Sequence, residues 1–309
     1  MPPTRESAVL TVANIREETG RILFHEREQI FSLPETDARA GISGRLREAL
    51  ERKTPVKAVL DPRRGIVQGI TPAAEKEAGE FERSRTLLDK PGKTVSVNVA
   101  EIDPTRFNVV DLTLKSPIFK LCTKIVPSYT KAKEIFDFCA QQSCNLGIPT
   151  TVTPCIPFQY VRDDCYARAH KMRWIIEQRY GYCCEKVFSF ANQNNDELSV
   201  RADKWGGCCV NWWYHVAPLI RVQIKISTFS FVIALVVDPS MFDKPVMLSS
   251  WLTAQENAAC GAHAKVSMYS IQPGSAYTPA NYAGTAFTTD PSYTATDATL
   301  IAYKNLTTC

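Results

Sequence analysis

The fold of this chain is decided by one stretch of sequence, DDCYARAHKMR, which runs from Asp163 to Arg173. It places Cys165 directly after two carboxylates and at the start of a segment, 165–180, whose apolar residues follow a helical period. Gly181 is a typical stop for such a helix, and Asp163 or Asp164 can cap its start. A helix N-terminus stabilises a thiolate, or an oxyanion on a substrate, because its N–H groups are free and its dipole favours negative charge. The pattern therefore predicts that Cys165 is a nucleophile.

Two later residues can complete a catalytic group with this cysteine. His215 lies in a predicted strand, 209–226, and Asp238 follows a second predicted strand, 229–237. If these strands form a hairpin centred on Ile226-Ser227, His215 and Asp238 face each other. Asp238 can then bind one imidazole nitrogen and leave the other for the thiol of Cys165. The alternatives are that Cys165 is half of a disulfide and that Asp238 is an ordinary turn residue.

The remaining histidines are predicted to be structural. His170 lies five residues after Cys165, so it points well away from the cysteine and is expected on the helix surface. His263 lies in a predicted loop without supporting features, and His25 reads as a strand or surface residue. None of the three is expected to act as a base.

Length and composition narrow the class of protein. The 309 residues fit one large domain or two ordinary ones, and 45% hydrophobic with 22% charged residues is typical of a folded chain. The net charge of +4 is spread along the sequence, so we expect no nucleic-acid partner. No apolar run approaches the roughly 18 to 20 residues of a membrane span, so we expect no membrane partner either.

The cysteines indicate an oxidising compartment. The chain has eleven, and the first 121 residues contain none. The adjacent pairs Cys183-Cys184 and Cys208-Cys209 do not have the spacing of zinc ligands, so we expect disulfides and no metal. An odd count leaves at least one thiol free, and Cys165 is the candidate.

The first segment reads as a small α+β unit. Predicted strands are 8–15, 21–33, 56–60, 66–70, 94–99 and 107–114, and predicted helices are 38–53 and one that starts at Thr71-Pro72 and continues to about residue 89. The segment contains no cluster of catalytic residues. A boundary is expected at 116–124, where a proline and basic residues precede the cysteine-rich part.

The second segment reads as α+β as well. A helix over 131–142 precedes the central helix, and a short strand is expected at 187–191. The tail from residue 249 onward is predicted to form loops and small strands, closed by Cys309. The fold class predicted for the whole chain is therefore α+β.

Six sequence blocks resemble the secreted bacterial protein-glutaminases, a family of protein deamidases. They are PCIPF (154–158), DCYARAHKMR (164–173), GYCCEK (181–186), CCV (208–210), YHVA (214–217) and DPSMF (238–242). The blocks keep their order and span most of residues 126–260, and the resemblance fades beyond residue 260. The first segment is similar to the pro-region of that family, although more loosely.

The resemblance implies a zymogen with a known chemistry. Residues 1–118 would be an inhibitory pro-domain, and residues 119–309 a mature catalytic domain with a papain- or transglutaminase-like core. Cys165 would be the nucleophile at a helix N-terminus, with the base His215 and the orienting acid Asp238 on an antiparallel sheet. The enzyme would hydrolyse the side-chain amide of protein-bound glutamine to glutamate and ammonia through a thioester, with no metal or organic cofactor.

The resemblance also implies partners and a location. The partners would be glutamine-containing proteins or peptides, the chain's own pro-domain and an activating protease. The protein would be a secreted monomer whose signal peptide is not part of this sequence. In this family the pro-region covers the active-site cleft, and the extended segment 24–31 is the candidate for the covering strand. Glu28 or Gln29 would lie near Cys165 and resemble the product or the substrate.

Two rival functions remain open at this point. A transglutaminase or a papain-like cysteine protease would use the same triad, and a non-catalytic, disulfide-rich secreted binding module would use none of it. The family pattern also leaves Cys122, Cys139 and Cys183 without counterparts, and we expect an extra bridge between Cys139 and Cys183.

Overall fold

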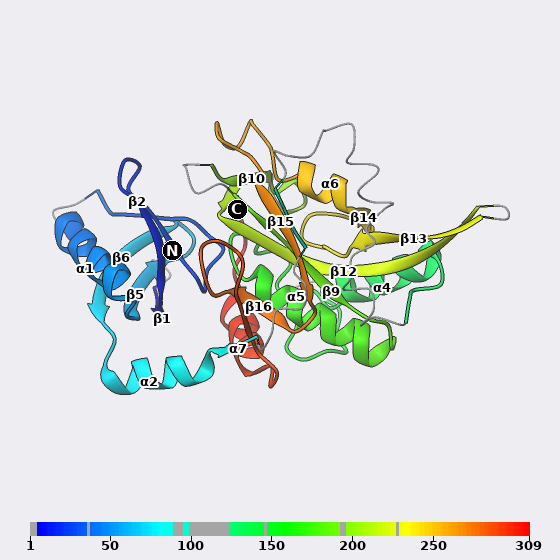
Figure 1. The fold of residues 1–309 in the computed structure, drawn as a ribbon, viewed down its shortest axis with the longest axis horizontal. Helices are drawn as coiled ribbons and strands as arrows, with labels where there is room; N and C mark the ends of the chain where they lie inside the picture. The colour runs from blue at the N-terminus through cyan, green and yellow to red at the C-terminus, as the bar shows by residue number, and fades with distance from the viewer. Residues whose placement is uncertain are drawn as a thin grey trace.

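The computed structural model describes residues 5–35, 38–88, 95–98, 124–144, 147–191, 196–226 and 229–309. They form an N-terminal unit, residues 5–88, and a C-terminal unit, residues 124–309, which lie side by side (Figure 1). Both units combine helices with mainly antiparallel sheets, so the α+β class predicted from the sequence is correct. The predicted strand 107–114, and most of the predicted boundary at 116–124, fall outside the described residues.

A six-stranded sheet with one covering helix forms the core of the N-terminal unit. Its strand order is β1-β5-β6-β4-β3-β2, and only the β4–β6 pair is parallel. The strands are β1 (Glu6–Leu10), β2 (Val12–Arg16), β3 (Arg21–Phe24), β4 (Phe31–Ser32), β5 (Val56–Asp61) and β6 (Ile66–Pro72). The helices are α1 (Ala38–Arg52) and α2 (Glu75–Ser84). Ile42, Leu46 and Ala49 recur at helical spacing on α1 and are buried against the sheet.

Three predictions for this unit need correction. The expected strand 8–15 is two strands, and the expected strand 21–33 is interrupted at residues 25–30. The helix expected to start at Thr71-Pro72 starts at Glu75 instead, because Thr71 still pairs with Lys57 in the sheet. A cap followed by proline is a weak signal where the preceding strand continues through it.

The C-terminal unit is built on a second six-stranded sheet, in the order β14-β13-β12-β9-β15-β8. Its strands are β8 (Val95–Asn98), β9 (Glu185–Phe190), β12 (Tyr214–Ile226), β13 (Phe229–Val236), β14 (Val246–Met247) and β15 (Met268–Pro273). Two smaller sheets contain β10 (Leu198–Arg201) with β11 (Cys209–Trp212), and β16 (Ala276–Pro279) with β17 (Phe287–Thr289) and β7 (Thr86–Leu87). The strands β7 and β8 thus join the first part of the chain to sheets of the second.

Helices cover both faces of this sheet (Figure 1). They are α4 (Tyr129–Gln141), α5 (Cys165–Trp174), α6 (Leu248–Thr253) and α7 (Thr294–Tyr303). A π-helical turn, η4 (Ile175–Arg179), continues α5, and a short 3-10 turn, η5 (Asp203–Trp205), precedes β11. Val216 and Val222 of β12 pack in the same core as α4 and α5, whereas Ala217 and Leu219 pack with Trp251 of α6. The strand β12 is therefore buried on both faces. Among the described residues, no helix is both long and apolar enough to cross a membrane.

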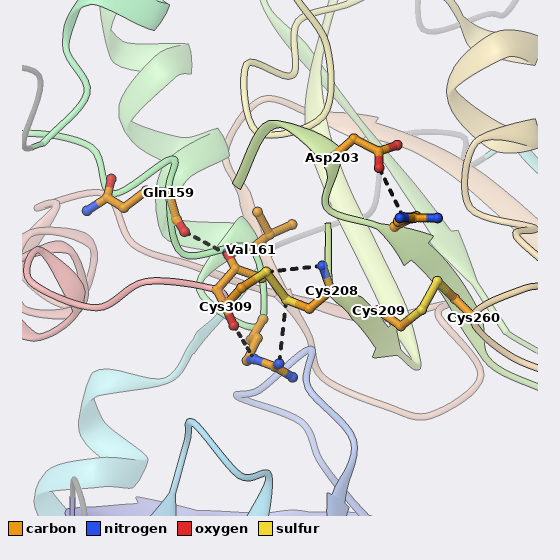
Figure 2. The surroundings of a disulfide bond; sticks show 10 residues. Gln159, Val161, Asp203, Cys208, Cys209, Cys260 and Cys309 are labelled. Carbon is orange, nitrogen blue, oxygen red and sulfur yellow. Dashed lines mark hydrogen bonds and ion pairs between the residues drawn. A yellow bond between two sulfur atoms is a disulfide. The ribbon is translucent and has the colours of Figure 1, made fainter. Parts of the chain in front are cut away.

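The tail differs from the prediction of loops and small strands, because it contains the helices α6 and α7. The expected strand 209–226 is also divided, with β11 ending at Trp212 and β12 starting at Tyr214. The tail does end as predicted: Cys309 is bonded to Cys208, beside the strand β11 (Figure 2).

Two further bridges join Cys144 to Cys155 and Cys209 to Cys260. The expected bridge between Cys139 and Cys183 is wrong. The thiol of Cys139 is free and buried on the core face of α4, whereas Cys183 is disulfide-bonded. Cys165 is free, as predicted, and so is the buried Cys184.

Candidate active site

The turn that leads into α5 places Cys165 at the first residue of the helix. Asp164 adopts a left-handed backbone with φ of 71°, which aspartate tolerates better than most residues. Its carboxylate forms an ion pair with Arg168 rather than a cap on the helix, which corrects that expectation. Arg168 also donates to the carbonyl oxygens of Tyr160 (2.5 Å) and Asp163 (2.7 Å). The buried Arg168, whose role the sequence did not reveal, therefore holds the turn that presents the cysteine.

His215 is fixed by Asp238 and by two tryptophans. Its Nε2 lies 2.9 Å from Asp238 Oδ2, and its ring stacks on Trp212 at 4.4 Å and on Trp251 at 5.4 Å between centroids. Trp251 Nε1 donates to the same Oδ2 (3.0 Å), and the N–H of Ser240 donates to Oδ1 (3.2 Å). Asp238 thus holds one imidazole nitrogen and leaves Nδ1 available.

His215 and Asp238 lie together as expected, and β12 and β13 form the expected antiparallel hairpin, but its register is displaced, so the two residues do not pair within it. Ile226 pairs with Phe229, and the β12–β13 ladder ends where Leu219 pairs with Val236. His215 instead pairs with Ser189 of β9. Asp238 reaches the histidine from beyond the end of the ladder, where the indole of Trp251 helps to hold it.

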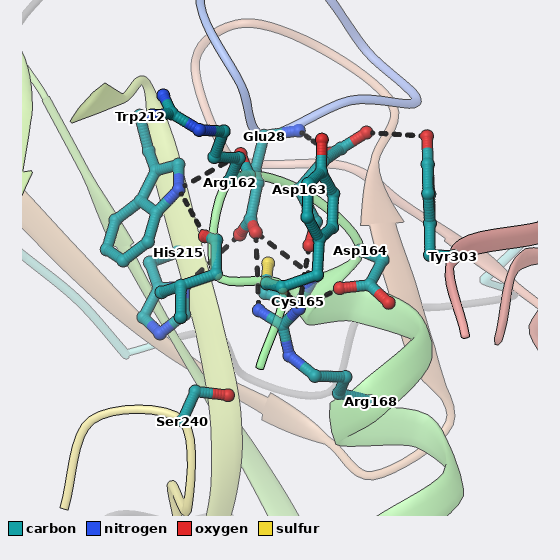
Figure 3. A network of polar contacts seen from close by, with 12 residues as sticks. Glu28, Arg162, Asp163, Asp164, Cys165, Arg168, Trp212, His215, Ser240 and Tyr303 are labelled. Carbon is teal, nitrogen blue, oxygen red and sulfur yellow. Dashed lines mark hydrogen bonds and ion pairs between the residues drawn. The ribbon is translucent and has the colours of Figure 1, made fainter. Parts of the chain in front are cut away.

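Glu28 of the N-terminal unit lies between the cysteine and the histidine (Figure 3). Its Oε1 accepts from the N–H of Cys165 at 3.2 Å, and its Oε2 lies 3.2 Å from His215 Nδ1. One oxygen of Glu28, one ring nitrogen of His215 and Cys165 Sγ all lie within 4.8 Å of one another. Of the two candidates in segment 24–31, Glu28 therefore occupies the site. Gln29 points away from the cysteine, and its amide donates to the carbonyl of Pro62 (3.0 Å).

The electrostatics favour a neutral thiol and a charged imidazole in this state. Burial raises the pKa of Cys165, the negative charge of Glu28 raises it further, and the N–H of Val216 opposes both. Burial lowers the pKa of His215, but the hydrogen bonds to Asp238 and Glu28 outweigh it, so the net shift is upward. The carboxylate of Glu28 therefore fills the space between Cys165 and His215 and disfavours the thiolate, which is the reactive form of a cysteine.

His170 is buried, so the expectation that it lies on the helix surface is wrong. Its Nε2 lies 3.0 Å from the carbonyl oxygen of Asp290, and its Nδ1 lies 2.7 Å from Lys186 Nζ. This satisfied pair explains why polar residues of the DDCYARAHKMR stretch are buried within the core. His263 is exposed. His25 lies in a turn after β3 and is buried with its ring edge-on to Trp213, so the expectation of a strand or surface residue is wrong.

Comparisons with known proteins agree with this geometry. A family model described as a glutaminase matches residues 132–255. The crystal structure of a protein-glutaminase is 34% identical, with a TM-score of 0.51, over 60% of this chain and 92% of that chain. This chain belongs to the protein-glutaminase family.

Of two further structures, one matches almost the whole chain and the other about the same share as the first. The crystal structure of a pro-protein-glutaminase is 26% identical with a TM-score of 0.69, over 98% of this chain and 94% of that chain. The NMR structure of protein-glutaminase from Chryseobacterium proteolyticum is 33% identical with a TM-score of 0.50, over 59% and 90%. No match to this chain is found among curated proteins. The chain is thus a protein-glutaminase precursor, in which a pro-region precedes the enzyme.

The three donor atoms of Glu28, Cys165 and His215 are of types that bind zinc. Glu28 belongs to the N-terminal unit, and Cys165 and His215 to the C-terminal unit. The two donors of the C-terminal unit alone are fewer than the three protein ligands typical of a catalytic zinc site.

Proposed function

We propose that the activated protein hydrolyses the side-chain amide of protein-bound glutamine to glutamate and ammonia, with Cys165 as nucleophile, His215 as acid and base, and Asp238 as the residue that orients His215. The observation that carries the proposal is Glu28. A glutamate side chain is the product of this reaction, and its carboxylate contacts both the N–H of Cys165 and His215 Nδ1.

The two carboxylate oxygens suggest where the reacting atoms go. Oε1 marks the position of the amide oxygen, which becomes an oxyanion when Cys165 Sγ, having given its proton to His215 Nδ1, attacks the amide carbon. The N–H of Cys165 donates to that position, and Arg168 Nη2 lies 3.5 Å from it. Oε2 marks the position of the amide nitrogen, next to His215 Nδ1. His215 can therefore protonate the nitrogen as the carbon–nitrogen bond breaks, which releases ammonia and leaves a thioester.

Hydrolysis of the thioester would use the same positions in reverse order. A water molecule at the site vacated by ammonia gives a proton to His215 Nδ1 and attacks the thioester carbon. The carbon–sulfur bond then breaks, which yields glutamate and regenerates Cys165. Asp238 keeps the second nitrogen of His215 in a hydrogen bond throughout and stabilises the imidazolium form.

The organisation of the zymogen is part of the proposal. Residues 1–118 act as the inhibitory pro-domain and residues 119–309 as the mature enzyme, with a protease cutting between them. We further propose that the protein is secreted and that the mature enzyme is a monomer. The three disulfides between described residues and the chain's membership of the protein-glutaminase family support the oxidising compartment.

The experiment separates this function from its rivals. The precursor is activated by limited proteolysis and incubated with a glutamine-containing protein, and ammonia, cross-links and new chain termini are measured. Ammonia without cross-links or new termini supports deamidation, cross-links indicate a transglutaminase, and new termini indicate a protease. The precursor carrying Cys165→Ala, treated identically, must release no ammonia. No reaction of any kind, together with a Cys165 thiol that resists alkylation after activation, would favour a non-catalytic binding module.

A further inference from the structure

The segment around Glu28 is held by main-chain contacts that any extended peptide can make. The N–H of Glu28 donates to Asp163 Oδ1 (3.0 Å), and the carbonyl of Glu28 accepts from the N–H of Trp213 (3.1 Å). The carbonyl of Arg27 accepts from the indole of Trp213 (2.7 Å), and Gln29 forms an antiparallel bridge with Trp212. All of these contacts use main-chain atoms of residues 27–29. They therefore fix the position of residue 28 whatever side chains its neighbours carry.

A substrate peptide held in this way would bring its glutamine to the catalytic pair. Glutamine and glutamate side chains have the same length, so the amide of a glutamine at position 28 would reach Cys165 and His215 as the carboxylate does. The residue before the glutamine would then lie where Arg27 lies. The surroundings of Arg27 therefore describe a subsite of the enzyme, if the proposed function is correct.

That subsite is built to receive a guanidinium group. Arg27 Nη1 donates to the hydroxyl of Tyr166 (2.8 Å), and Arg27 Nε lies 3.3 Å from Asp163 Oδ2. The guanidinium carbon lies 5.8 Å from the ring centroid of Tyr303. The hydroxyl of Tyr303 donates to Asp163 Oδ2 (3.1 Å), and its ring stacks on Tyr160. Carboxylate, phenol oxygen and aromatic face are the groups that arginine prefers.

The charge balance of the subsite changes when the pro-region leaves. In the precursor, Arg27 is also paired with Glu6 of β1, which belongs to the N-terminal unit. Once that unit is removed, Asp163, Tyr166 and Tyr303 remain on the enzyme. Burial raises the pKa of Asp163 to about 7, and Arg27 opposes that shift. A cationic substrate residue would supply the same compensation, whereas an acidic residue would oppose it.

We infer that the activated enzyme prefers a glutamine directly preceded by arginine, and that Asp163, Tyr166 and Tyr303 form the subsite for this cation. The inference rests on the proposed deamidase function and adds a sequence preference to it. A preference for the residue before the glutamine also fixes the direction in which the substrate chain binds.

The test compares matched peptides on protease-activated protein. One peptide scaffold carries arginine, methionine or glutamate directly before a single glutamine, and a fourth peptide carries arginine directly after it. We expect kcat/KM for ammonia release to be about tenfold higher for arginine than for methionine, the gain of one hydrogen bond to a charged group, and lowest for glutamate. The transposed peptide should gain nothing over methionine.

Substitutions in the subsite then test which residues cause the preference for arginine. Tyr166→Phe keeps the ring and removes the oxygen that accepts from the guanidinium, so most of the roughly tenfold arginine-to-methionine ratio should be lost. Tyr303→Phe should also lower the ratio, because the carboxylate of Asp163 loses the hydrogen bond that holds it beside the guanidinium. Tyr129→Phe, on the exposed side of α4, is the control and should leave the ratio unchanged.

Failure of the arginine preference and failure of the proposed deamidase function give different results. Equal rates for the arginine and methionine peptides, or a gain for the transposed peptide, overturn the inference while deamidation stands. Ammonia release from none of the peptides or from a glutamine-containing protein overturns the proposed function and the inference with it.

Discussion

The bridge between Cys208 and Cys309 should be the most stabilising of the three described disulfides. Its two cysteines are 101 residues apart, against 11 for Cys144 and Cys155. A cross-link restricts the unfolded chain more when the loop is longer, by about 4.7 kcal/mol for a loop of roughly 100 residues and about 2.8 kcal/mol for one of about 11. Replacing both Cys208 and Cys309 by serine should therefore lower the free energy of unfolding about 2 kcal/mol more than the matched double replacement at Cys144 and Cys155.

The same bridge also anchors a tail that supports the active-site turn. The hydroxyl of Thr308 accepts from the N–H of Val161 (2.7 Å) and donates to the carbonyl of Gln159 (2.7 Å), just before the residues that lead to Cys165. Thr308→Val keeps the bridge and leaves both backbone groups without this partner, at a cost of about 1–3 kcal/mol. Loss of the bridge should therefore lower the rate of ammonia release as well as stability.

Urea unfolding of the oxidised precursor measures these free energies, and an unchanged slope with denaturant shows that the comparison is valid. The ammonia assay after activation measures the effect on the site. Equal destabilisation by the two double replacements, or a larger loss at Cys144 and Cys155, would refute the loop-length reasoning. Full activity without the Cys208–Cys309 bridge would refute the support of the active-site turn by the tail.

Three further predictions concern single residues. Asp238→Asn should lower kcat for ammonia release by roughly 10²- to 10⁴-fold, because a neutral amide neither fixes the tautomer of His215 nor stabilises its charged form; a loss below about tenfold contradicts that role. In the intact precursor, Glu28→Gln places an amide between the catalytic groups. Peptide mass mapping should find it hydrolysed back to glutamate, or held as a thioester, only when Cys165 is present; a persistent amide argues against the pose. Burial lowers the pKa of His25 from 6.5 to about 4, so its share of stability is lost as the pH falls from about 6.5 to about 4. In the His25→Phe variant, the free energy of unfolding should fall about 3 kcal/mol less over this pH range than in the unsubstituted protein. An unchanged pH dependence of the free energy of unfolding would contradict this.

The start of the central helix was predictable because its signals are local. The position of Cys165 follows from the periodic apolar residues after it and the carboxylates before it. Even so, the role of Asp164 was not predictable, since its carboxylate pairs with Arg168 instead of capping. Capping geometry depends on the backbone of the turn, and here that backbone is left-handed.

The pairing of His215 and Asp238 was predicted for a reason that the structure does not support. A hairpin without Gly or Asn at its turn carries little information on register, and the actual ladder is displaced from the expected one. Asp238 is held by Trp251 of α6, a six-residue helix that is too short to show a period. The helix α7 was missed because its threonines are poor helix formers, so it depends on its burial against α5.

Contacts between residues far apart in the sequence could not be predicted from local patterns. Cysteine connectivity does not follow from sequence, and the wrong Cys139–Cys183 bridge shows this. For the covering segment, neighbouring side chains of an extended chain point to opposite sides, so one of Glu28 and Gln29 had to face away. Which one faces Cys165 is decided by the pairing of that segment with Trp212 and Trp213.

The glutamate at position 28 has a thermodynamic consequence for the precursor. Because glutamate is the end point of the proposed reaction, the enzyme cannot convert its own inhibitory side chain into anything else, however reactive Cys165 is. Tethering in the same chain holds this side chain at an effective concentration in the millimolar range or above, so weak affinity is enough to keep the site filled. After the chain is cut, dilution alone removes that advantage. The timing of activity is then set by the protease, while glutamate formed on substrates stays too dilute to inhibit.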